Sequence, residues 1–180
     1  MQSLNNSILI ISKMLVFAEK PQNLPASYGL VVFYAVALLL VTSFLNVVGE
    51  YYEILPSVAV QIVIEAAIVW TILRISGRIA RWKQTITALF GTDCLIQGVM
   101  FLPVSAMWSS TTTNPEGTYW GGMVIVLFGI WSLAVSVLII KESLEISKLK
   151  AFFICFGLAI LTSIIVISVV GSESFEVGTS

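Results

Sequence analysis

The chain has 180 residues, of which 58 % are apolar and 11 % are charged, and its mean hydropathy is +1.00. Because soluble proteins carry about 25 % charged residues, these few charged side chains cannot cover a water-facing surface, and much of the molecule must face lipid. The net charge of −1 provides no basic surface for nucleic acid, and the absence of histidine removes the commonest general base and metal ligand. We therefore expect no catalytic site, no cofactor, no metal ion and no nucleic-acid partner.

Residues 1–20 predict an amphipathic helix that lies on the cytoplasmic surface of the membrane. At about 100° per residue, Ser12 and Lys13 fall on a polar arc, whereas Ile11 and Met14 fall on the opposite, apolar face. This pattern favours an interfacial helix over a spanning one. The start of the chain carries no positive charge, which a secretory signal would have.

Five apolar stretches follow, each close to the roughly 20 residues that a helix needs to cross a hydrocarbon core about 30 Å thick. Only helices satisfy their own backbone hydrogen bonds in lipid, so the fold class is all-α, a polytopic membrane protein. The predicted spans are residues 28–48, 54–74, 85–106, 119–140 and 151–171. They make up a five-helix domain over 21–172, followed by a short non-cytoplasmic tail, 173–180. Short connections predict that consecutive spans pack as antiparallel neighbours.

The basic residues predict the orientation of these spans. All nine lie in the N-terminal segment, in the second connection or in the fourth, and none lies in the first connection, in the third or in the tail. Because lysine and arginine remain on the cytoplasmic side, the N-terminus is expected in the cytoplasm and the C-terminus on the far side. Four basic residues of the second connection are interpreted as topology determinants that can contact anionic headgroups: Arg74, Arg78, Arg81 and Lys83.

Glu65 and Asp93 are the only ionisable residues well inside the predicted spans. Each has an amide one helical turn away, Gln61 before Glu65 and Gln97 after Asp93. Counting from the turn between the second and third spans places both carboxyls at a similar depth. A charge at mid-bilayer costs about 2.5–3.5 kcal/mol, so both should face protein or water. With no basic residue at that depth, we expect at least one of the two to be protonated at neutral pH.

Three interpretations of this polar cluster remain open. It can hold two helices together by interhelical hydrogen bonds, form the proton- or cation-responsive site of a small transporter or channel, or bind a partner or lipid. A dry contact between the second and third spans would favour the first interpretation, and a water-accessible cavity that reaches Glu65 would favour the second. The sequence has no motif of an intramembrane hydrolase, and Cys94 and Cys155 are interpreted as packing residues.

Three stretches resemble a known family: KPQNLPAS at 20–27, RWKQTITALFGT at 81–92 and IWSLAVSVLIIKESLEISKLKAF at 130–152. They are similar to short bacterial inner-membrane proteins that in turn resemble the bacterial branch of the Yip family. The resemblance implies five spans, a cytoplasmic N-terminus and a location in the bacterial inner membrane. Eukaryotic members act in vesicle trafficking and bind small GTPases through a soluble N-terminal region. The family's Asp-Leu-Tyr-Gly-Pro motif is absent here, so GTPase binding is not carried over.

These patterns together predict an integral membrane protein of Yip-like architecture that is not an enzyme. It is expected to act in the lipid bilayer through contacts with lipids, with a membrane-protein partner or with a second copy of itself. The alternative is a small transporter or channel that responds to protons or cations through Glu65 and Asp93.

Overall fold

A computed structural model describes residues 2–48, 55–110 and 115–170, and all the regular structure in these ranges is helical. The six α-helices in these ranges are α1 (Gln2–Leu15), α2 (Tyr28–Val48), α3 (Leu55–Ile75), α4 (Trp82–Ser110), α5 (Pro115–Leu144) and α6 (Lys148–Val170). Two short 3-10 helices, η1 (Pro21–Asn23) and η2 (Ile79–Arg81), precede α2 and α4. The predicted tail, 173–180, lies outside the described residues.

Five of these helices, α2 to α6, contain stretches long and apolar enough to cross a membrane. This confirms the all-α, five-span fold class and makes the chain a multi-pass membrane protein. Helices α4 and α5 are longer than the predicted spans 85–106 and 119–140 and extend beyond them at both ends.

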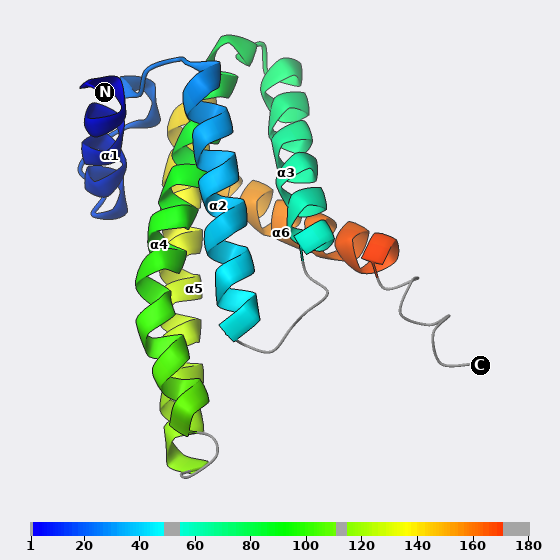
Figure 1. Cartoon of the computed structure of the whole chain (residues 1–180). Helices are drawn as coiled ribbons and strands as arrows, with labels where there is room; N and C mark the ends of the chain where they lie inside the picture. The colour runs from blue at the N-terminus through cyan, green and yellow to red at the C-terminus, as the bar shows by residue number, and fades with distance from the viewer. Residues whose placement is uncertain (1, 49–54, 111–114, 171–180) are drawn as a thin grey trace.

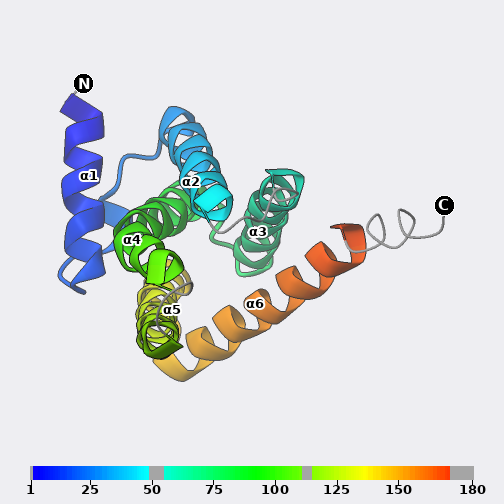
Figure 2. The ribbon, with the colours of Figure 1, turned by 60° about the horizontal axis from the view of Figure 1, so that its bottom comes forward.

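Helices α4 and α5 form a long antiparallel pair at the centre of the molecule (Figure 1). Helix α2 packs along α4, and α1 packs against α4 beside it. Helix α3 packs mainly against α6 and α2, and α6 runs obliquely from the end of α5 towards α3 (Figure 2). The consecutive helices α3 and α4 are antiparallel, but they touch only sparsely.

Helix α1 buries its apolar face against α4. Ile11 and Met14 are fully buried, as the helical periodicity predicts for one face. At the end of α1, the Trp131 indole Nε1 donates a hydrogen bond to the Leu15 carbonyl oxygen over 3.0 Å. Trp131 lies 13 residues before the end of α5, or about 20 Å along that helix. The helix therefore slants along the side of the bundle, and its position at the membrane surface stays a prediction.

We call the end of the bundle where α2, α4 and α6 begin and α3 and α5 end the basic end. There Glu145, the residue that follows α5, adopts a left-handed φ of 52°. Two C-terminal carbonyls of α5 are hydrogen-bonded by side chains from elsewhere: Gln22 Nε2 donates to Glu142 O over 2.6 Å, and Arg81 Nη1 donates to Ser143 O over 3.2 Å. These bonds replace the partners that a helix end lacks, and they tie η1 and η2 to α5.

Candidate functional site

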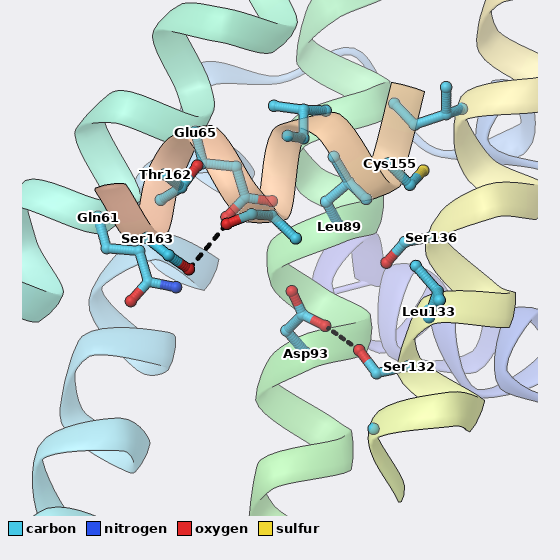
Figure 3. Close-up of a pocket in the computed structure, with 14 residues that line it drawn as sticks. Gln61, Glu65, Leu89, Asp93, Ser132, Leu133, Ser136, Cys155, Thr162 and Ser163 are labelled. Atoms are coloured by element: carbon cyan, nitrogen blue, oxygen red, sulfur yellow. Dashed lines mark hydrogen bonds between the residues drawn. The ribbon is translucent and has the colours of Figure 1, made fainter. Parts of the chain in front are cut away.

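A polar cavity of about 540 Å³ lies among α3, α4, α5 and α6, inside the predicted membrane region (Figure 3). Pockets that hold small ligands commonly measure about 300–1,000 Å³, so this one has room for a small organic molecule or for several waters. Its polar lining comes from all four helices: Gln61 and Glu65 of α3, Asp93 of α4, Ser132 and Ser136 of α5, and Thr162 and Ser163 of α6. We refer to this space as the acid cavity.

Glu65 reaches the acid cavity from the middle of α3, ten residues before the helix ends. The residue is partly buried, and its carboxyl forms no hydrogen bond or ion pair with any other residue that the structure describes. Gln61, one turn earlier on the same face, lines the cavity too. The Glu65 carboxyl is therefore available to a ligand, a proton or water.

Asp93 reaches the same cavity from α4, 11 residues after the helix begins. The Ser132 hydroxyl on α5 donates a hydrogen bond to Asp93 Oδ1 over 3.1 Å (Figure 3). This bond fixes one carboxyl oxygen and leaves the other directed towards the cavity. Asp93 thus lies on the central pair α4 and α5, whereas Glu65 lies on α3, which packs mainly on α2 and α6.

The hydroxyl side chains of α5 and α6 are site residues that the sequence interpretation missed. Ser132 and Ser136 are one turn apart and share a face of α5, while Thr162 and Ser163 lie on α6. The signal in the sequence that could have indicated them is the i,i+4 spacing of Ser132 and Ser136 in an apolar helix. Hydroxyls are also common in membrane helices for a local reason, as at Ser163, whose Oγ donates to the Ala159 carbonyl over 2.8 Å.

Gln97 does not line the acid cavity, although it lies one turn from Asp93. Its side-chain carbonyl accepts a hydrogen bond from the Thr42 hydroxyl of α2 over 2.5 Å. The reason is that α2 packs along α4, so the Gln97 side chain faces α2 and not the cavity. Of the four predicted cluster residues, the structure thus brings Gln61, Glu65 and Asp93 together and places Gln97 at a separate helix contact.

The predicted headgroup-contacting residues split into two kinds. Arg78 and Arg81 form ion pairs with Glu145 over 2.6 and 2.7 Å, so both guanidinium groups are engaged within the protein. These hydrogen bonds, from Arg81 first and then Arg78, hold the pKa of the exposed Glu145 carboxyl below its usual range. These two ion pairs hold the α3–α4 turn against the end of α5.

The other two basic residues of this turn lie over aromatic rings. The Arg74 guanidinium is 4.8 Å from the centre of the Trp70 ring, and the Lys83 Nζ is 3.8 Å from the centre of the Tyr28 ring. Amphipathic rings with a cation at the end of a span are typical of a membrane interface. Arg74 and Lys83 therefore remain candidates for headgroup contact.

Both cysteines are free, and their surroundings differ. Cys155 is buried and lines the acid cavity, whereas Cys94 is partly buried beside Asp93 in the sequence. The described residues contain no group of three or more His, Cys, Asp or Glu side chains that could hold a metal ion.

The electrostatics of the acid cavity follow from its lining. Of the described residues that surround it, none carries a positive charge, and two carry carboxyls. Two negative charges in a space with apolar walls repel each other and lose hydration, which is costly unless a proton or cation accompanies them. The hydroxyls and the Gln61 amide can then complete the hydrogen bonds of a bound cation's hydration shell or of a protonated amine. The chain matches no known family model, no curated protein and no solved structure.

Proposed function

We propose that the protein is a small membrane carrier or channel that takes up protons or cations through Glu65 and Asp93. The observation that carries the proposal is the acid cavity itself, a space of about 540 Å³ that contains both carboxyls. A dry contact between α3 and α4 would have favoured a purely structural role. Instead the two helices touch only sparsely and the cavity separates their acids.

The proposed role of each acid follows from its support. Asp93 is held by Ser132 on the central helix pair, which suits a fixed binding group. Glu65 lies on α3, which packs on α2 and α6 rather than on the central pair, and its carboxyl has no partner among the described residues. The Glu65 carboxyl is therefore the group that takes up and releases the ion.

Purified protein in proteoliposomes tests this proposal. The vesicles contain a pH-sensitive dye and a potassium–valinomycin potential drives proton entry, and separate experiments impose a gradient of sodium. We expect flux above that of protein-free vesicles for at least one of these cations. Glu65→Gln and Asp93→Asn should each lower the flux by at least about tenfold, which corresponds to a loss of ~1.4 kcal/mol of ion binding.

A matched control is Glu19→Gln, which removes an acid outside the spans; Glu19 accepts a hydrogen bond from Asn23 over 2.5 Å. This variant should leave the flux unchanged, and thermal melting should show that all variants fold. Flux equal to that of protein-free vesicles for every cation would overturn the proposal, as would wild-type flux in both cavity variants. Crosslinking to a membrane partner that both cavity variants retain would then favour a Yip-like interaction protein.

We also propose that the basic end faces the cytoplasm of a bacterial cell and that the protein lies in the inner membrane. The support is the position of Lys20, Arg78, Arg81 and Lys141, which meet at that one end through their ion pairs with Glu142 and Glu145. Reporter fusions within the α5–α6 turn should read as cytoplasmic, and fusions after residue 180 as periplasmic. The reverse pattern would contradict this orientation.

A further inference from the structure

A second hollow, separate from the proposed function, lies at the basic end between α5, the start of α6 and the turn that follows α1. It measures about 330 Å³, and we call it the lysine groove. Its walls are mainly apolar, with two lysines among them: Phe17, Leu133, Val137 and Phe152 with Lys141 and Lys148.

The groove has a polar end and an apolar end. Along α5 its lining runs from Ile130 to Lys141, a distance of about 16 Å. Lys141 lies near the end of α5, and Lys148 is the first residue of α6. The cations therefore lie at the mouth, at the level of the headgroups, and the apolar walls continue into the membrane.

The turn after α1 forms one wall of the groove. Phe17 adopts a left-handed φ of 60°, and the Ala18 amide donates to the Lys13 carbonyl over 2.9 Å, so the turn closes the end of α1. A non-glycine residue in this conformation costs roughly 1 kcal/mol. About half of the Phe17 side chain remains exposed beside the groove. Phe152 on α6, exposed by 38 %, forms the opposite wall.

The charges at the mouth favour an anion. Lys141 pairs with Glu142, and Glu142 also pairs with Lys20 over 3.1 Å, so one carboxylate is shared by two lysines. Lys148 forms no ion pair with any residue that the structure describes. Its position at the start of α6 adds the positive end of that helix dipole. Arg78 and Arg81 of the α3–α4 turn do not line the groove.

We propose that the lysine groove binds one anionic phospholipid. Its phosphate lies between Lys141 and Lys148, and one acyl chain lies along Val137 and Phe152. Basic pockets between membrane helices bind anionic headgroups in this way. The apolar walls distinguish these two lysines from Arg78, Arg81 and Lys150 of the same end, which do not line the groove.

Native mass spectrometry of the detergent-solubilised full chain tests this, with phosphatidylglycerol and phosphatidylcholine of identical acyl chains as the probes. Wild-type protein should retain one phosphatidylglycerol in preference to phosphatidylcholine. The double variant Lys141→Gln, Lys148→Gln should bind phosphatidylglycerol roughly 30-fold more weakly, with little change for phosphatidylcholine. Ala134→Phe, which fills the groove with a ring, should weaken both lipids.

The matched control is Lys150→Gln, which removes a lysine of the same helix start that does not line the groove. It should bind as wild type does, and Lys148→Arg should preserve the preference. Equal retention of the two lipids by wild-type protein would overturn the proposal. Weakening by Lys150→Gln as large as that of the double variant would also overturn it, because the attraction would then be diffuse. Melting temperatures within the wild-type range exclude unfolding as the cause.

Discussion

Gly91 allows α1 to approach α4 closely, and this contact can be tested by adding one methyl group. A Cβ at this position would overlap the Cδ1 of Ile11 and lie 3.3 Å from its Cγ1 and 3.4 Å from Cδ1 of Tyr34. Ile11 is fully buried, so its side chain cannot move into open space. Gly91→Ala should therefore push α1 away from α4.

The magnitude follows from two opposing effects. Overpacking a core costs about 1–3 kcal/mol, while alanine gains up to about 1 kcal/mol over glycine in a helix. We expect Gly91→Ala to lower the free energy of unfolding by roughly 1–2 kcal/mol. Ile11→Val removes the overlapping Cδ1 and by itself costs about 0.5–1.5 kcal/mol. In the double variant the new methyl group fills the vacated space, so the two losses should not add.

The assay is reversible unfolding of the detergent-solubilised protein by dodecyl sulfate, followed by circular dichroism, for the four proteins of this double-mutant cycle. The coupling energy should favour the double variant by at least about 0.5 kcal/mol. Gly98→Ala is the matched control on the same helix, because a Cβ there meets nothing within 4 Å. The reasoning is refuted if Gly91→Ala costs the same with and without Ile11→Val, or if Gly98→Ala costs as much.

Three further predictions concern single contacts. Thr42→Val should lower the free energy of unfolding by roughly 0.6–1.5 kcal/mol, because the Gln97 carbonyl loses its donor, and Thr42→Ser should restore it. The hydrogen bond from Arg81 lowers the pKa of Glu145 in the folded state, so this group stabilises the fold above its unfolded pKa of about 4.3. This stability is lost as the pH falls through the folded value, and melting curves of Glu145→Gln should show a smaller acid-induced decrease, most clearly at low salt. Trp131→Phe removes the donor to the last carbonyl of α1, and hydrogen exchange should then rise in α1 but not in α4.

The five spans could be predicted because the signal for each is local. A run of about 20 apolar residues indicates a membrane span by its length and hydropathy alone, whichever helices it packs against. The bounds of α2, Tyr28–Val48, coincide with the predicted 28–48 for this reason. At the basic end, α5 continues past its predicted span, and there Ser143 Oγ accepts a hydrogen bond from the Thr85 hydroxyl of α4 over 2.8 Å, a contact that apolar composition does not report.

The neighbours of each helix could not be predicted, because they depend on contacts between segments far apart in the chain. Amphipathicity shows that Ile11 and Met14 are buried, but it does not distinguish burial in lipid from burial against α4. A glycine at 91, in the middle of an apolar helix, was the one local sign of a close approach. Gln97 was assigned to the wrong contact for the same reason, since only the position of α2 directs it to Thr42.

The sequence could predict that Glu65 and Asp93 lie at a similar depth in the membrane, because both positions can be counted from the turn that joins their helices. The cavity between them depends on α5 and α6, which enter from later in the chain. Two acids at one depth can either touch in a dry helix contact or line an open cavity. Here they line a cavity, to which the oblique helix α6 contributes part of the wall. No local pattern predicts the path of α6.

Leu133 on α5 lines both the acid cavity and the lysine groove. Leu133→Ala should join the two spaces, and Cys155, buried in the cavity wall, can report it. In a Cys94→Ala background, a membrane-impermeant thiol reagent added at the basic end should modify Cys155 faster once Leu133 is truncated. Leu138→Ala, which widens the groove alone, should leave the rate unchanged. An unaltered rate in Leu133→Ala would show that another wall separates the spaces, and an equal rise in both variants would show general loosening of α5.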